Sequence, residues 1–103
     1  MSWAGYKTPR WRRLREKILR RDGYRCREWA RYGRAVQADT VHHVWPVEDW
    51  PEFAWREWNL ISLCQAKHNE MHNRTDGRLT PIGESWMRRV SPPTSEVPVG
   101  DTS

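Results

Sequence analysis

A chain of 103 residues is long enough for one domain, and a hydrophobic fraction of 37% limits the core that it can bury. Eighteen Lys and Arg against thirteen Asp and Glu give a formal charge of +5, which favours a polyanionic partner such as nucleic acid. The sequence has no run of 18 apolar residues and no signal-peptide pattern, which excludes a membrane-spanning helix and predicts a cytoplasmic protein.

The first predicted element is a helix that follows a short leader. Residues 1–7 are expected to be flexible, and the helix is expected to begin after them. Thr8 is a suitable N-cap, Pro9 suits the first helical turn, and Gly23 marks a stop beyond the last turn.

A narrow apolar stripe on this helix is surrounded by basic side chains. Trp11, Leu14 and Ile18 fall at helical spacing on one side. The basic residues around them are Arg10, Arg12, Arg13, Arg15, Lys17, Arg20 and Arg21. So dense a cluster predicts contacts with DNA phosphates, and the alternative is a charged face that is merely solvated.

The middle of the chain predicts a strand between irregular segments. Turns are expected at Cys26 and around Gly33, and a strand is expected over residues 38–44. The strand stops at a proline. Residues 45–58 contain two prolines and four tryptophans without a clean period, which predicts an irregular loop packed by its aromatic rings.

The C-terminal half predicts a short apolar segment and two helices. The segment NLISLC leads into residues 65–77, for which a helix ending near Gly77 is expected. Thr80 and Pro81 then predict a last short helix to about Val90. The expected organisation is a single domain over residues 8–90 and a disordered tail, rich in Pro and Ser, over residues 91–103.

The four histidines are the candidate site. On a helix, the side chains of His68 and His72 would share one face and could hold one ion, although a simple pair of surface histidines is the alternative. His42 on the strand adds a third imidazole and leaves open positions for water and a phosphate oxygen. Because neighbouring strand positions point to opposite faces, His43 is left free to act as a general base.

These motifs resemble those of the HNH endonucleases. The order and spacing of HHVWP, of the asparagine in WNLISLC and of HNEMH match that family over residues 24–74. The resemblance implies an α+β protein with a small ββα-metal core, also called a His-Me finger, which the colicin nucleases share. The basic N-terminal helix and a short C-terminal helix would flank that core.

The resemblance also implies a role for each residue of the motif. His42, His68 and His72 would bind the metal, and His43 would activate a water molecule. Asn59 would pin the loop and so orient the general base. One divalent cation is implied, and the sequence leaves Mg, Mn, Ni, Co and Zn open.

The sequence departs from small phage-type members of this family at a structural zinc site. Those members carry two C-x-x-C pairs, whereas this chain reads CREW and CQAK, with Trp29 and Lys67 in place of the second cysteines. Cys26 and Cys64 alone are half of a zinc site, so no tight structural zinc is predicted. Trp29 is expected to fill the volume of the metal knuckle, with the Lys67 ammonium pointing outward. A Cys26–Cys64 disulfide is the weaker alternative and requires oxidising conditions.

The expected function is that of a metal-dependent HNH-type DNA endonuclease or nickase of low sequence specificity. DNA is the expected partner of a monomer, and the resemblance adds phage packaging proteins such as a large terminase subunit or a portal. Two alternatives stay open. One is a non-catalytic or weakly active DNA-binding or assembly accessory that has lost its structural zinc, and the other is a purely structural histidine cluster.

Overall fold

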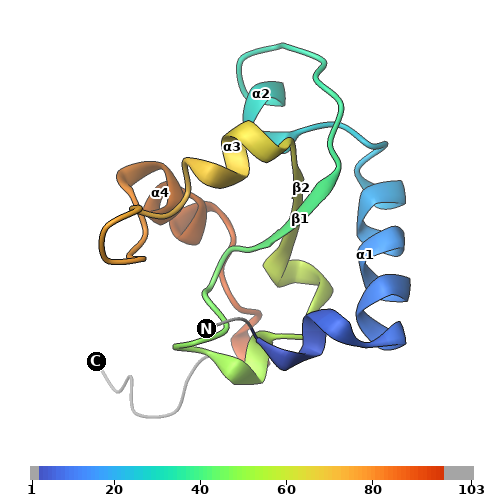
Figure 1. Ribbon diagram of the computed structural model, residues 1–103, viewed down its shortest axis with the longest axis vertical. Coiled ribbons are helices and arrows are strands. Elements are labelled where there is room, and N and C mark those ends of the chain that lie inside the picture. The colour runs from blue at the N-terminus through green and yellow to red at the C-terminus, as the bar shows by residue number, and fades with distance from the viewer. Residues whose placement is uncertain (1–2, 97–103) are drawn as a thin grey trace.

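A two-stranded antiparallel sheet lies between the helices of this chain (Figure 1). The computed structural model describes residues 3–96. Strand β1 is Thr40–His43 and strand β2 is Leu60–Leu63, and the short helix α3, Gln65–Asn69, follows directly. The order of two strands and a helix confirms the predicted α+β class with a ββα core.

The pairing of the two strands sends the adjacent histidines to opposite faces. His42 pairs with Ile61, and His43 pairs with Leu60. All four residues are buried. The side-chain alternation of a strand therefore gives His42 and His43 different surroundings, as the sequence predicts.

Helix α1, Pro9–Arg21, begins where the sequence predicts. The Thr8 side chain accepts a hydrogen bond from the Trp11 amide, and Pro9 occupies the first turn. At its other end, Arg21 donates to the Leu60 carbonyl at 2.7 Å. Asp22, which caps the helix, accepts from the Ser62 amide at 3.1 Å. The end of α1 thus satisfies backbone groups along the outer edge of β2, where no third strand pairs in residues 3–96.

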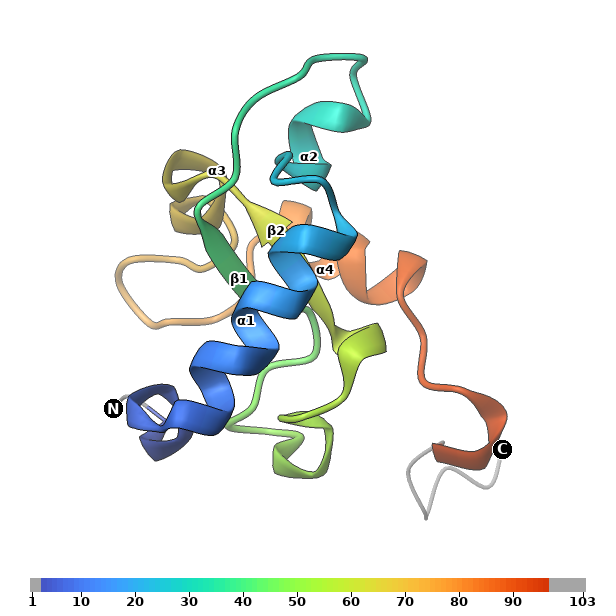
Figure 2. The ribbon, with the colours of Figure 1, turned by 90° about the vertical axis from the view of Figure 1, so that its right-hand side faces the viewer.

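The two faces of the sheet bury separate apolar clusters. Figure 2 shows α1 in front of the sheet and α4, Pro81–Arg89, behind it. The α1 face buries Trp11, Ile18, Leu19, Ala38, Val41 and Leu60. The opposite face, which α2 (Arg27–Ala30) and α4 cover, buries Cys26, Val44, Ile61, Leu63, Met71 and Trp86.

Three predicted segments differ from the structure. The leader is not loose over its described part, because Trp3 packs against the α1-side core and Ala4–Lys7 form a 3-10 turn. The helix expected over residues 65–77 ends at Asn69. Of the predicted tail, Thr94–Glu96 form a 3-10 turn, and residues 97–103 lie outside the described part.

No helix among residues 3–96 is both long enough and apolar enough to span a bilayer.

Candidate metal and general-base site

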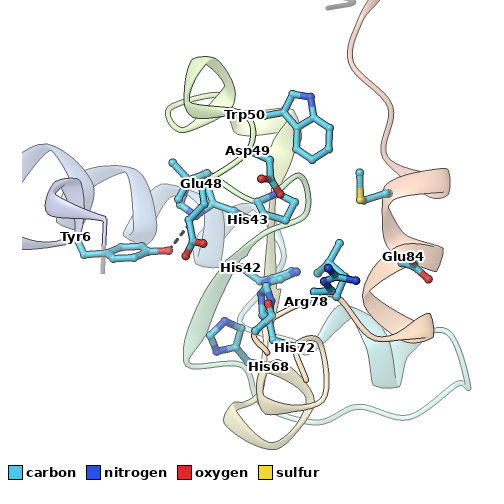
Figure 3. A pocket seen from close by; sticks show the side chains of 15 residues that line it. Tyr6, His42, His43, Glu48, Asp49, Trp50, His68, His72, Arg78 and Glu84 are labelled. Atoms are coloured by element: carbon cyan, nitrogen blue, oxygen red, sulfur yellow. Dashed lines mark hydrogen bonds between the residues drawn. The ribbon is translucent and has the colours of Figure 1, made fainter. Parts of the chain in front are cut away.

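A cleft of about 400 Å³ brings all four histidines together. Its wall comes from the N-terminal turn, β1, the loop after β1, α3 and the segment after it, and α4 (Figure 3). The described residues that contribute side chains with polar groups are Tyr6, His42, His43, Glu48, Asp49, Trp50, His68, His72, Arg78 and Glu84.

His42 is the most deeply placed imidazole of the cleft. Its exposed fraction is 2%, and its Nε2 atom is buried without a hydrogen-bond partner. Burial, together with the nearby His68 and His72 rings, lowers the pKa of His42 well below its ordinary value. The ring is therefore neutral at pH 7 and keeps an unprotonated nitrogen, which is the form that a metal ion binds.

His68 and His72 approach His42 from the segment after the sheet. The ring centres of His68 and His72 lie 5.4 and 5.6 Å from that of His42. Burial, then His72, lowers the pKa of His68. Two imidazoles bound to one ion at roughly 2.1 Å have ring centres about 5 Å apart, so these spacings suit a shared cation.

The two histidines do not share a helix face, which corrects the sequence prediction. His68 lies in α3, but His72 lies beyond its end and forms an isolated β-bridge with Leu79. Nδ1 of His72 is 3.1 Å from the Gly77 carbonyl, which can only accept, so Nδ1 carries the hydrogen. The Nε2 of a neutral His72 is then left as an acceptor, as in many metal-binding histidines.

The nitrogen atoms of His42, His68 and His72 do not surround a common point in this structure. Within residues 3–96, no set of three or more His, Cys, Asp or Glu side chains is placed to hold a metal ion as it stands. The unpartnered Nε2 of His42 nevertheless fits a cation, because a buried polar atom without a partner costs free energy that a metal bond would recover. An imidazole donor set also suits a divalent transition metal.

His43 points to the other side of β1 and is held on both ring nitrogens. Its Nε2 is 3.0 Å from the Ala54 carbonyl, and its Nδ1 is 3.1 Å from the Tyr6 hydroxyl. The ring stacks on Trp11 at 5.2 Å between centres. Burial lowers the pKa of His43, although the hydrogen bond to Ala54 opposes that shift. A neutral ring with Nε2 protonated leaves Nδ1 as the basic nitrogen.

Asn59 pins the loop that joins the two strands. Its side chain is fully buried, and its Oδ1 accepts from the Trp45 amide at 2.7 Å. Its Nδ2 donates to the Trp45 and Phe53 carbonyls at 3.1 and 3.2 Å. Phe53 precedes Ala54, the residue whose carbonyl holds His43. The hydrogen bonds of Asn59 therefore fix the backbone that orients that imidazole.

Sequence reasoning missed several residues of the cleft. Among the described lining residues, Arg78 is the one Arg or Lys, and three carboxyl groups share the rim with it. Arg78 follows Gly77, which the sequence marked as a helix end and not as part of a site, and which has a positive φ in the structure. Tyr6 gave no signal, because 37 positions separate it from His43.

The basic side chains of α1 divide into two groups. Five make intramolecular contacts: Arg10 lies over Trp55, Arg15 donates to the Asp39 carbonyl, Lys17 pairs with Glu57, Arg20 lies 4.0 Å from Glu16, and Arg21 donates to the Leu60 carbonyl at the edge of β2. Arg12 and Arg13 are exposed and make no ion pair with a described residue. These two are the side chains most available to a polyanion.

The two cysteines lie together on the α2 side of the sheet. Cys26 is fully buried, and Cys64 is partly buried just before α3. Both are free thiols. Burial raises the pKa of the Cys64 thiol, and the nearby Cys26 thiol adds to that shift. Trp29 packs against the cluster that contains Cys26.

The fold of this chain is similar to that of a phage nuclease of known structure. It is similar to the crystal structure of the HNH endonuclease of the deep-sea thermophilic bacteriophage GVE2, determined with a manganese ion. The TM-score is 0.62 at 29% sequence identity, over 85% of this chain and 84% of that one. No protein-family model and no curated protein sequence matches the chain.

Proposed function

We propose that this chain, which has an HNH-family fold, is a metal-dependent endonuclease that hydrolyses DNA with low sequence specificity. The observation that carries the proposal is the unpartnered, buried Nε2 of His42 beside the rings of His68 and His72. His43 lines the same cleft, and its basic nitrogen contacts Tyr6, which also lines it. The proposed metal ligands and the proposed general base therefore line one cleft, in which the substrate would bind.

The proposed division of roles follows from the tautomers. His42, His68 and His72 would hold one divalent cation, which would polarise the scissile phosphate and stabilise the leaving oxygen. His43 would take a proton from water at Nδ1, while its Nε2–H continues to donate to the Ala54 carbonyl. Asn59 would keep that carbonyl in place through Phe53. The manganese ion in the similar phage enzyme supports a divalent cation here.

Basic side chains support DNA as the substrate, although three carboxyl groups share the rim of the cleft with Arg78. Arg78 would contact a phosphate at the cleft, because its guanidinium donates in a fixed fork that suits phosphate oxygens. Arg12 and Arg13 would contact the backbone farther along α1. Contacts of this kind give affinity without reading bases, which is why low sequence specificity is proposed.

Cleavage of supercoiled plasmid with a panel of divalent cations tests the proposal. The parent protein is expected to nick or cut with at least one cation. His43→Ala should lower the rate by about 10²- to 10⁴-fold, the range for loss of a general base. His72→Ala should lower both the rate and the cation affinity. Tyr32→Phe, an exposed change away from the cleft, serves as the control.

The competing function is a DNA-binding accessory that does not cut. One observation favours it: no set of metal-ligating side chains in residues 3–96 is already arranged around an ion. Under that function, His43→Ala would leave any residual nicking unchanged while DNA binding persists. Equal nicking rates for the parent and His43→Ala, with a measured affinity for DNA, would therefore exclude the endonuclease.

A further inference from the structure

The N-terminal turn covers the face of His43 that opens to the cleft. The Trp3 ring meets the His43 ring edge-on at 5.3 Å between centres, and the Trp11 ring stacks beneath it. Between them, the Tyr6 hydroxyl lies 3.1 Å from Nδ1, the contact drawn as a dashed line in Figure 3. Tyr6 itself is 41% exposed and lines the cleft.

The direction of this hydrogen bond follows from the partners of His43. The Ala54 carbonyl can only accept, so the hydrogen of a neutral His43 ring is on Nε2 and Nδ1 has the lone pair. The Tyr6 hydroxyl must then donate. Burial, followed by the negative charge of Glu48, raises the pKa of Tyr6, so the hydroxyl keeps its proton.

An imidazole Nδ1 has one lone pair, and a single hydrogen bond occupies it. We propose that the Tyr6 hydroxyl occupies Nδ1 of His43 and withholds this nitrogen from water until the hydroxyl moves away. The inference rests on the proposed function for its effect on cleavage. Its geometric part, that Tyr6 blocks Nδ1, concerns the protein alone and is testable without a metal ion.

The packing of the turn holds Tyr6 at this place. The Trp3 ring lies so close to Gly5 that an added Cβ would be 2.2 Å from a ring carbon, so only glycine fits. Thr8 donates to the Gly5 carbonyl at 2.7 Å and also caps α1, which ties the turn to the helix. The backbone is therefore fixed, and because the Tyr6 side chain is partly exposed, the proposed movement of its hydroxyl would leave the turn folded.

The substitution Tyr6→Phe isolates the hydroxyl, because a phenylalanine ring keeps the packing on Trp3 and Trp11. The matched control is Tyr32→Phe, which removes a hydroxyl from an exposed ring elsewhere. Diethyl pyrocarbonate, which acylates an imidazole lone pair, is the probe in metal-free protein. Tandem mass spectrometry of the peptide separates the His43 product from that of His42.

Acylation of His43 is expected to be about two- to tenfold faster in Tyr6→Phe than in the parent, the factor that one ordinary hydrogen bond is worth. The control variant should match the parent. In the cleavage assay at saturating DNA, kcat of Tyr6→Phe should rise by a similar factor, with a smaller change in KM.

Two results would overturn the inference: an unchanged acylation rate at His43, or a fall of kcat in Tyr6→Phe. Failure of the proposed function has a different signature. If no variant cleaves DNA with any cation but Tyr6→Phe still accelerates acylation, the endonuclease fails while the block of Nδ1 by Tyr6 stands.

Discussion

The Lys67 ammonium lies 4.3 Å from the centre of the Trp29 ring, so the two residues that replace the expected cysteines contact each other. Lys67 also pairs with Glu70 at 3.2 Å, and its side chain is only 15% exposed. The ammonium therefore folds over the ring instead of pointing outward, which corrects the sequence prediction. A cation–π contact and the Trp29 packing occupy the place where the resemblance puts two thiolates.

This contact predicts that a zinc site can be rebuilt. In a variant with both Trp29→Cys and Lys67→Cys, four thiols would surround one volume, because Cys26, Cys64 and Trp29 pack in one cluster and the Lys67 ammonium lies against the Trp29 ring. The double variant is expected to bind one zinc ion per chain and to melt at a higher temperature with zinc than with a chelator.

Zinc counting after dialysis, with melting followed by circular dichroism, measures this outcome. Each single variant supplies three thiols and is the control, and it should lose its zinc to a chelator far more readily. A double variant that holds no more zinc than the parent would show that the four positions do not converge in a tetrahedral arrangement.

Local sequence signals correctly predicted the helix starts that are set by neighbouring residues. Thr8 with Pro9, and Thr80 with Pro81, mark two helix starts that the structure reproduces. The prediction that His42 and His43 point to opposite faces was also local, because side-chain alternation depends only on the period of a strand. These features follow from near neighbours in the chain, which a single sequence contains.

The errors arose where distant partners decide the backbone. The helix predicted over residues 65–77 ends early because the Glu70 and Met71 carbonyls accept hydrogen bonds from the Thr80 side chain and amide. Helix propensity is too weak to override such contacts. The contact of Tyr6 with His43 could not be predicted for the same reason, since 37 positions separate the two residues.

Asn59→Ala is predicted to destabilise the fold by about 2–4 kcal/mol, because three hydrogen bonds made by a fully buried side chain are lost. Urea unfolding measures the loss. The control is Asn69→Ala, which removes one exposed side-chain hydrogen bond to Gln65. Equal stability of Asn59→Ala and the parent would mean that the loop does not depend on this side chain.

Asp22 gives a prediction for the pH dependence of stability. Burial of its carboxyl opposes ionisation, but hydrogen bonds from Arg21 and Ser62 prevail and hold its pKa below the ordinary value. The unfolded chain therefore binds more protons between the two pKa values. The stabilisation is present above the unfolded pKa of about 3.9 and is lost as the pH falls through the folded value.

Asp22→Asn is accordingly expected to be less stable than the parent at pH 7, with the gap closing below about pH 4. Urea unfolding between about pH 2.5 and pH 7 tests this. Asp49→Asn removes the same charge from an exposed carboxyl and should leave the pH profile unchanged. A constant gap between Asp22→Asn and the parent across this range would rule out the ionised carboxylate as the source of the stabilisation.

The basic residues of α1 are predicted to differ in what they support. Arg12 and Arg13 make no ion pair with a described residue, so changing both to Gln should weaken DNA binding while the melting temperature stays within about 2 °C. The slope of log affinity against log salt should fall by about two, one for each lost phosphate contact.

Arg21→Gln is the matched control on the same helix. It removes one positive charge, half of what the double variant removes, and also the hydrogen bonds to the Glu57 and Leu60 carbonyls, so its main effect should be on stability. Fluorescence anisotropy with a labelled duplex across a salt series separates the two cases. If Arg21→Gln lowered the salt slope as much per charge as the double variant does, the division of these residues into DNA-contacting and structural groups would be wrong.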